Sequence, residues 1–256
     1  MKNILNDLIA EQSLVDNLVS GLADEQWLKP VPGTGTWTIR ETIVHIAFFD
    51  YAAKKLMTGE AEDLMVISKE AGQDEYYRSH AYDGMSGADA LRWWREERTR
   101  MTALFFDKDP KDRIPWAPGL PMSARSLASA RLMELWAHSV DIYDSLGLDP
   151  VVEDRIAHTL FLSWQARANA YRINGFELPE TPLYLELTLP GGGIWEKGDP
   201  AAENCIKGTA KDWALVSIRR RNWHNTGLKI SGSEAERYAN VVQTYAGRAD
   251  KAPETK

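Results

Sequence analysis

Apolar side chains recur at helical spacing through most of the first 174 residues. A helix that buries one face repeats its apolar positions every three to four residues, so this pattern predicts a series of amphipathic helices. Loops rich in proline and glycine separate them. The expected helices cover residues 3–22, 38–57, 86–107, 126–146 and 151–174, with a helical turn at 23–27, a further short helix at 62–78 and loops at 30–36 and 109–119.

Three helix ends carry recognisable signals. Thr38 followed three residues later by Glu41 is a capping box, which predicts that the second long helix begins there. Either Ser123 or Ser126 is the expected N-cap of the fourth long helix. Gly147 follows the last apolar residue of that helix and is typical of a C-terminal stop.

The pattern changes after residue 174. Residues 175–181 form a linker rich in proline and glycine, and residues 184–189 then alternate between apolar and polar, as a half-buried strand does. The expected strands cover residues 184–189, 194–196, 204–208 and 228–230, and the expected helices begin at Thr209 and Ser233. We therefore expect the fold class α + (α+β): a four-helix bundle over residues 1–175, a small α+β domain over 180–247, and a disordered tail over 248–256.

Composition narrows the class of protein. The chain has 256 residues, of which 44% are hydrophobic and 26% charged, as in ordinary globular proteins. A net charge of −7 argues against a nucleic-acid partner. The single cysteine, Cys205, excludes an intramolecular disulfide and fits a reducing compartment. We find no apolar run long enough to span a membrane and no signal peptide, so we expect a cytoplasmic protein without a membrane partner.

The fourth long helix carries a narrow polar stripe. At 100° per residue, Arg131, Glu134, His138 and Asp141 fall within one arc, and apolar side chains occupy the remainder. Glu134 and His138 are four residues apart, so their side chains lie one above the other and are spaced to share a metal ion, with Asp141 placed to support them. The alternative is that this stripe is only the solvent-exposed face of the helix.

His45 in the helix at 38–57 is the second candidate. Phe49 and Ala52 share its face, whereas Arg40 and Asp50 are expected on the opposite side, so His45 is expected to face inward. An inward histidine is either a core residue or a metal ligand. Helical bundles build metal sites in their cores from such side chains on facing helices.

The remaining charged and histidine residues are interpreted as structural. Four arginines and two glutamates in the helix at 86–107 are expected to form a solvated face: Arg92, Arg95, Glu96, Glu97, Arg98 and Arg100. His80 is expected in a surface loop, and His158 is given no role. Cys205, on an expected strand, is interpreted as a packing residue.

Three separated blocks resemble one protein family. Residues 37–50 look like its "GWTVxDxVAHLAxxD" block, residues 134–141 look like its "ExWxHxxD" block, and residues 183–247 resemble its small sterol-carrier-like domain. The family is the mycothiol-dependent maleylpyruvate isomerase family, within the DinB/YfiT-like metal-binding helical bundles. Inside this family, the chain is most similar to a subgroup of actinobacterial-type metal-binding proteins.

The resemblance implies a DinB-like bundle that holds a divalent metal through His45, Glu134 and His138. Zinc is the expected metal and nickel the alternative. Two histidines and one carboxylate are the set expected of an open catalytic zinc site. The resemblance also places Asp141 behind one of the histidines, orienting its ring. The sequence does not decide which histidine Asp141 contacts.

The family uses an arginine from the small domain at its active site. Arg219, Arg220 and Arg221 stand at the corresponding place, and Arg220 aligns best. Its guanidinium is expected to bind a carboxylate of the substrate or of the thiol cofactor. The alternative is that three arginines at a helix C-terminus only complement the helix dipole.

The resemblance further implies a low-molecular-weight thiol cofactor such as mycothiol. In the family's reaction the thiol adds to a cis double bond, and rotation followed by elimination gives the trans product. We therefore expect a metal- and thiol-dependent isomerase or thiol transferase that acts on a small electrophilic or unsaturated acid. The expected assembly is a monomer or a homodimer.

Two other functions stay open at this point. One is a metal-dependent hydrolase, in which Asp50 or Asp141 would act as the base for a metal-activated water. The other is a non-enzymatic protein that binds a metal or an apolar ligand. A fourth protein ligand such as His80 would favour that last function.

Overall fold

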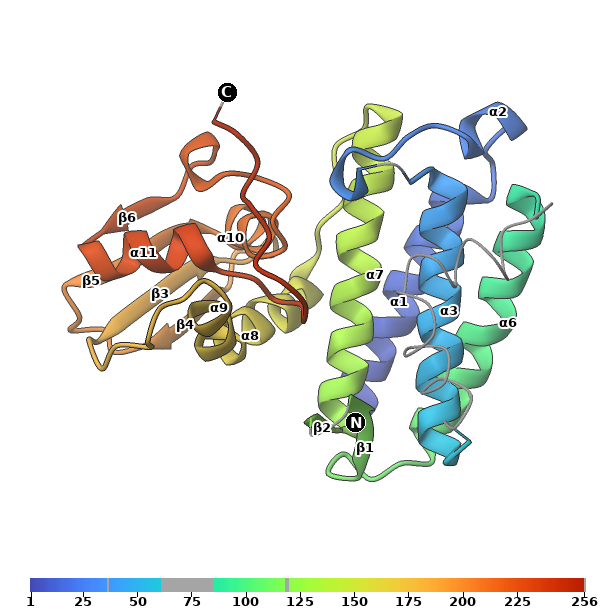
Figure 1. The fold of residues 1–256 in the computed structure, drawn as a ribbon, viewed down its shortest axis with the longest axis horizontal. Coiled ribbons are helices and arrows are strands. Elements are labelled where there is room, and N and C mark those ends of the chain that lie inside the picture. Colours follow the sequence, from blue (N-terminus) through green and yellow to red (C-terminus); the bar gives the residue numbers. More distant parts are fainter. Residues whose placement is uncertain (36, 61–84, 118–119, 256) are drawn as a thin grey trace. The chain divides into compact units, whose positions relative to one another are not determined.

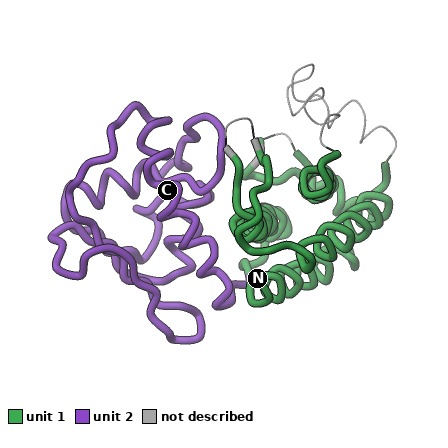
Figure 2. The backbone as a smooth tube through the Cα atoms, turned by 90° about the horizontal axis from the view of Figure 1, so that it is seen from below, with its two compact units in different colours: residues 1–150 green, residues 151–256 purple. Residues whose placement is uncertain are grey.

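The computed structural model describes residues 1–35, 37–60, 85–117 and 120–255. The expected helix at 62–78 and the expected loop residue His80 therefore lie outside the described residues. The chain divides into two compact units, residues 1–150 and 151–256 (Figure 2).

Four long helices form the described part of the first unit, which confirms the predicted bundle (Figure 1). α3 packs along α6 and α7, and α1 packs on α6 and α7. Their apolar faces meet in one core that includes Leu5, Ile43, Trp94 and Leu132. The elements are α1 (Lys2–Val19), α2 (Asp24–Trp27), the 3₁₀ turn η1 (Pro32–Thr34), α3 (Ile39–Thr58), α6 (Gly87–Phe106) and α7 (Ala124–Leu146).

The predicted helix ends are confirmed at both site-bearing helices. At the start of α3, the Thr38 hydroxyl accepts from the Glu41 amide at 3.3 Å, and the Glu41 carboxylate accepts from the Thr38 amide at 2.7 Å. Ser123, rather than Ser126, is the N-cap of α7. Gly147 ends α7 with φ of 70°, a left-handed conformation that glycine adopts without strain. These caps fix where along each helix the polar side chains lie.

A two-stranded hairpin connects α6 to α7, so the prediction that all of residues 109–119 form a loop is wrong. β1 (Arg113–Ala117) pairs antiparallel with β2 (Leu120–Ser123). Pro115 in this segment is typical of a loop and hides the strand pattern. Proline is tolerated here because both strands of a two-stranded sheet are edges.

The second unit is an α+β fold, as predicted. Its sheet has the order β4-β3-β5-β6, in which β3 and β5 are parallel and the other pairs antiparallel. α10 and α11 both pack on this sheet. The elements are η3 (Asp154–Ile156), α8 (Ala157–Gln165), α9 (Arg167–Ile173), β3 (Leu183–Thr188), β4 (Ile194–Gly198), β5 (Asn204–Thr209), α10 (Ala210–Ser217), η4 (Trp223–Asn225), β6 (Lys229–Ser231) and α11 (Ser233–Val241).

The units divide after Pro150, earlier than the linker at 175–181 that we predicted as the boundary. The reason is that α8 and α9, which replace the single helix expected at 151–174, pack with α10 and α11. Buried polar contacts join them: Trp213 donates to the Ser163 hydroxyl at 3.0 Å, and Tyr238 donates to the Ser163 carbonyl at 2.7 Å. These two helices therefore belong to the small unit.

The described residues after Val241 contain no helix or strand, and hydrogen bonds join the segment expected to be a disordered tail to the rest of its unit. The Arg219 guanidinium donates twice to the carbonyl of Asp250, at 2.6 and 3.0 Å, and once to the carbonyl of Asn240 at 2.9 Å. Asn222 donates to the carbonyl of Pro253 at 2.9 Å. These bonds hold the chain as far as residue 253.

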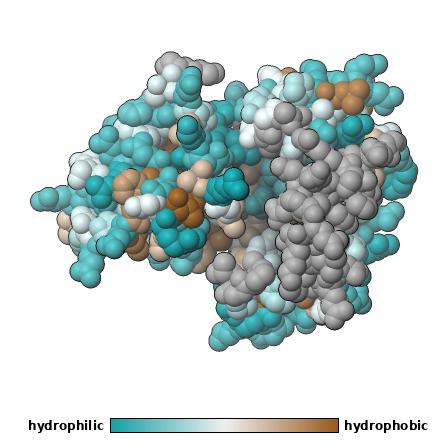
Figure 3. All heavy atoms as spheres, viewed as in Figure 1, coloured by the Kyte–Doolittle hydropathy of each residue, from teal (hydrophilic) through white to brown (hydrophobic). Residues whose placement is uncertain are grey.

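Hydrophilic side chains predominate among the described residues on the face drawn in Figure 3. On the face drawn in Figure 3, apolar side chains occur in small groups among hydrophilic ones. None of the described helices is both long enough and apolar enough to cross a membrane.

Candidate metal centre

Three potential metal donors meet inside the bundle. His45 comes from α3, and Glu134 and His138 come from α7. One donor atom from each lies within 4.8 Å of the other two. The centroids of the two imidazole rings are 4.6 Å apart. The structure thus brings together the three residues that the sequence singled out from two separate helices.

The polar stripe of α7 faces the protein interior, so the solvent-face alternative is wrong. Arg131, His138 and Asp141 expose only 2%, 7% and 0% of their surface, and Glu134 is half-buried. Ionisable side chains are rarely buried unless they are paired or bind an ion. This stripe therefore needs partners inside the bundle.

Asp141 contacts His138, which answers the question that the sequence left open. Its Oδ2 lies 3.1 Å from Nδ1 of His138, and Nε2 of the same ring lies 3.6 Å from Oε2 of Glu134. An ionised carboxylate only accepts hydrogen bonds, so Nδ1 carries the proton in the neutral ring and Nε2 keeps its lone pair. The free lone pair therefore faces the Glu134 carboxylate.

The two carboxylates also act on the charge of the ring. Burial disfavours the charged form of His138, but hydrogen bonds from the ring to Asp141 and Glu134 outweigh it and raise the pKa of this histidine. The two carboxylates together therefore favour a positive charge at this point of the core. A bound cation satisfies the same preference.

Half-buried aromatic rings surround the donors. The Trp37 ring lies 4.7 Å from the ring of His45 and is stacked on that of His138 at 6.0 Å. The Phe49 ring contacts His45 edge-on at 4.8 Å. Trp116 lies 6.0 Å from Phe49. Such rings exclude water from the polar groups that they cover. Trp37 belongs to the block at residues 37–50 that resembles the family, but no pattern in the sequence assigns it a role at the site.

Asp50 is buried, so its expected position on the outer face of α3 is wrong. It is 3% exposed, and its carboxylate accepts from Arg131 at 2.9 Å and from the Trp94 indole at 3.1 Å. Burial raises the pKa of the Asp50 carboxyl, and the two donors oppose that shift. Both oxygens are engaged, which makes Asp50 a poor general base.

The charged face of α6 is only partly solvated, contrary to the prediction. Arg95 and Arg98 donate to the carboxylate of Asp16 on α1, at 2.6 and 2.5 Å. Glu97 is 4% exposed and accepts from Lys54 of α3 at 2.5 Å. Some of these charges therefore tie the helices of the bundle together.

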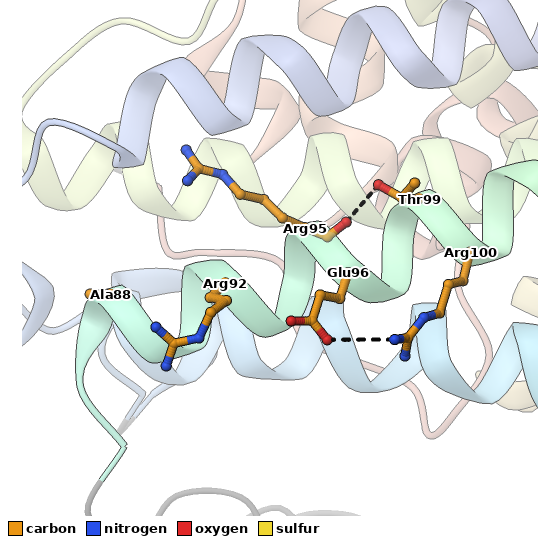
Figure 4. A pocket seen from close by; sticks show the side chains of 6 residues that line it. All are labelled: Ala88, Arg92, Arg95, Glu96, Thr99 and Arg100. Atoms are coloured by element: carbon orange, nitrogen blue, oxygen red, sulfur yellow. Dashed lines mark hydrogen bonds and ion pairs between the residues drawn. The ribbon is translucent and has the colours of Figure 1, made fainter.

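A surface cavity of about 590 Å³ follows the charged side of α6 (Figure 4). None of the three donors lines it. Figure 4 shows that Glu96 pairs with Arg100 along the helix and that the Thr99 hydroxyl donates to the Arg95 carbonyl. The residues that line the cavity are Ala88, Arg92, Arg95, Glu96, Thr99 and Arg100. This cavity is therefore separate from the His–Glu–His cluster.

In the second unit, the three arginines differ in their partners. Arg219 has φ of 62°, and its guanidinium is engaged by the carbonyls of Asn240 and Asp250. Arg220 and Arg221 are half-buried and donate to nearby backbone carbonyls. Arg219 is thus committed to holding the end of the chain, which leaves Arg220 and Arg221 as the candidates for ligand binding.

Cys205 is half-buried in β5. It stands opposite Tyr184 of β3 and Ser231 of β6 in the sheet. This position fits the expected packing role.

One family model matches just over half of the chain, and two relatives match it over nearly its whole length. The family model described as the mycothiol maleylpyruvate isomerase N-terminal domain matches residues 8–143, which include all three donors. Two uncharacterized proteins of Mycobacterium tuberculosis, from strains CDC 1551 and H37Rv, are each 31% identical to the chain over 244 residues, 94% of either chain.

Solved structures agree in fold. The crystal structure of the mycothiol-dependent maleylpyruvate isomerase matches with a TM-score of 0.58 and 15% identity, covering 90% of this chain and 92% of that one. A histidine-to-alanine variant of the isomerase matches with a TM-score of 0.58 and 14% identity, covering 86% and 89%. With a family model that spans more than half of its residues, the chain belongs to the mycothiol maleylpyruvate isomerase family.

Proposed function

We propose that the chain binds one divalent metal ion through His45, Glu134 and His138. The metal acts together with a low-molecular-weight thiol on a small electrophilic or unsaturated acid. The reaction is either isomerisation of the acid or transfer of the thiol to it. The observation that carries the proposal is the convergence of these three donors, from two helices, within 4.8 Å of one another in the bundle of this family.

The donor set suits a metal with open coordination positions. Two imidazoles and one carboxylate are the ligands that catalytic zinc sites use, and they leave room for a further ligand. Zinc is therefore the first choice, and nickel is the alternative because imidazole also suits that metal. A metal ion held there lowers the pKa of a thiol that it coordinates, so that a thiolate forms at neutral pH.

The chain's own residues prepare this site. Asp141 fixes the ring of His138 so that Nε2 faces the cluster. Trp37 and Phe49 cover the imidazoles and limit the access of water. In such a setting, charges interact more strongly than in water.

The thiol is proposed to come from outside the chain. The only cysteine, Cys205, is a half-buried strand residue of the second unit with a packing role. Mycothiol is the first choice because the family model bears its name. Arg220 is proposed to bind a carboxylate of the acid or of the thiol, since a guanidinium pairs with a carboxylate through two parallel hydrogen bonds.

The reaction needs no oxidant or reductant. The thiolate bonds to one carbon of a cis double bond, and the electron pair of that bond moves to the neighbouring activated carbon. Rotation about the resulting single bond and expulsion of the same thiolate give the trans product. In thiol transfer, the adduct instead takes up a proton and is released.

The hydrolase alternative is less well supported, because it needs a carboxylate base. Asp50 is held by Arg131 and Trp94, and Asp141 is held by His138. Neither of the two candidates is therefore placed to accept a proton from water. The third alternative, a binding protein without catalysis, is separated by the experiment below.

The test is a thiol-dependent conversion assay on the zinc-loaded chain. Maleylpyruvate and maleate are offered with mycothiol, with glutathione or without thiol, and cis-to-trans conversion and adducts are followed by NMR. We expect turnover only with thiol and zinc, and loss of turnover in His138→Ala, with His158→Ala as the matched control. Hydrolysis of ester probes without thiol would support the hydrolase, and binding without any conversion would refute both enzyme proposals.

A further inference from the structure

A buried ion pair joins α3 to α7 beside the candidate metal centre. The Arg131 guanidinium donates to Oδ1 of Asp50 at 2.9 Å and to the carbonyl of Ile46 at 3.3 Å. Both acceptors lie in α3 just after His45, and Arg131 precedes Glu134 by three residues, about one helical turn. The pair therefore connects the two helices directly next to their donors.

A third helix completes this arrangement. The indole of Trp94, on α6, donates to Oδ2 of Asp50 at 3.1 Å, and Trp94 is fully buried. The side chains of Asp50 and Arg131 expose only 4% and 2% of their surface. Both oxygens of Asp50 are thus engaged by donors from different helices, which fixes the carboxylate relative to α6 and α7.

Packing provides a second connection to the donors. The Arg131 guanidinium lies 5.7 Å from the centroid of the Phe49 ring, and the same ring contacts the imidazole of His45 edge-on at 4.8 Å. A displacement of Arg131 is therefore expected to shift His45, both through the backbone at Ile46 and through the ring of Phe49.

Stability alone does not explain such a pair. Removing two charges from water costs about as much as their attraction returns, and apolar residues of similar volume often stabilise a core equally well. Apolar contacts do not depend strongly on orientation. A planar guanidinium that donates to two acceptors on one helix allows few orientations of that helix. The contribution expected of the pair is therefore geometric.

We propose that Asp50 and Arg131 are positioning residues, which hold α3 against α7 at the register and rotation where His45 meets Glu134 and His138. This inference rests on the proposed metal site. Metal donors must be held within fractions of an ångström of their working positions. Loss of a group hydrogen-bonded directly to a metal ligand commonly costs about 10–100-fold in metal affinity, so we expect an effect at the lower end of that range for a pair that acts through the helices.

The test uses the double variant Asp50→Leu/Arg131→Met, which removes both charges and retains apolar volume. Cobalt(II) is the probe, because its visible absorption reports the coordination geometry. We expect a folded protein by circular dichroism that binds cobalt roughly tenfold more weakly or worse, in chelator competition, with an altered spectrum. The matched control is Lys54→Met/Glu97→Leu, which removes an ion pair between α3 and α6 and is expected to leave affinity and spectrum unchanged.

Arg131→Lys is the second variant, and it tests the positioning role if the double variant does not fold. It keeps the charge but loses the planar fork, so we expect weaker cobalt binding and a changed spectrum. Wild-type affinity and spectrum in the folded double variant, or in Arg131→Lys, would overturn the positioning role. Absence of cobalt binding by the wild-type chain would instead refute the metal site itself.

Discussion

Asp141 lies 3.1 Å from Nδ1 of His138, and the opposite nitrogen of that ring faces Glu134. Residues three and four apart on one helix thus place a carboxylate on each side of one imidazole. Asp141 orients the ring of His138. Glu134 lies beside the lone pair of Nε2, where both groups can donate to a metal ion. The spacing of α7 alone determines this half of the candidate centre, and α3 supplies His45.

Replacing Asp141 tests the orienting contact. Asp141→Ala removes the acceptor for Nδ1–H, so the ring of His138 can rotate and its basicity falls. We expect zinc affinity to drop by about 10–100-fold, with the helical circular dichroism retained. Asp141→Asn keeps an acceptor oxygen and is expected to lose less. Equal affinities in the wild type and Asp141→Ala, measured by chelator competition, would remove this role.

The network around Asp16 predicts how stability depends on pH. Hydrogen bonds from Arg95, together with the charge of Arg98, hold the pKa of Asp16 below its ordinary value despite its burial. Since the pKa is lower in the folded state, the network stabilises the fold above the unfolded pKa of about 3.9, and this stabilisation is lost as the pH falls further.

Asp16→Asn is the variant that tests this expectation. At pH 7 we expect its free energy of unfolding to be lower than that of the wild type by about 1.5–3 kcal/mol, the contribution typical of a hydrogen bond to a charged group. The difference should shrink as the pH falls below about 4, because the wild-type carboxylate then becomes protonated. Urea unfolding across this range measures it, and a difference that does not change with pH would contradict the assignment.

The arginines after α10 are expected to separate into two roles. Arg219→Gly keeps the positive φ but removes the guanidinium that binds the end of the chain. We expect it to lower the free energy of unfolding by about 1–3 kcal/mol and to expose residues 248–255 to proteolysis. Its thiol and substrate binding should stay near the wild-type values.

Arg220→Ala is expected to behave in the opposite way. It should weaken the binding of a carboxylate-bearing thiol or acid about tenfold or more, while zinc content stays at the wild-type level. Binding isotherms and metal analysis on the same samples distinguish the two variants. If ligand binding were lost in Arg219→Gly and kept in Arg220→Ala, the roles would be reversed.

Much of the candidate site could be predicted because it depends on local rules. The capping box at Thr38 and Glu41 fixes the start of α3, and the stop at Gly147 fixes the end of α7. Within α7, helical spacing brings Glu134 and His138 together without any tertiary information. The position of His45 opposite them rests on the resemblance, because spacing shows only that it faces inward.

The errors come from assigning each helix a single buried face. Asp50 and His45 are five residues apart, which is about 140° around the helix axis. A helix buried on one side would expose one of them, but α3 contacts both α6 and α7, so both residues are covered. Arg131 on α7 is the partner that makes burial of Asp50 tolerable, and no pattern within α3 indicates that partner.

The predicted boundary at residues 175–181 lies later in the chain than the observed division after Pro150, for a similar reason. α8 and α9 have apolar faces like those of the bundle helices, and periodicity does not tell which neighbour covers them. Their contacts with α10 and α11 decide it, through residues such as Tyr171, which donates to Glu234. Only the folded chain shows these contacts.

The most direct test of the central claim is the metal content of the zinc-reconstituted chain, measured by mass spectrometry on the wild type, His45→Ala and His158→Ala. We predict about one zinc ion per chain in the wild type and in His158→Ala, and most of it lost in a still-folded His45→Ala. Full zinc occupancy in His45→Ala, or no zinc in the reconstituted wild type, would contradict a metal centre formed by His45, Glu134 and His138.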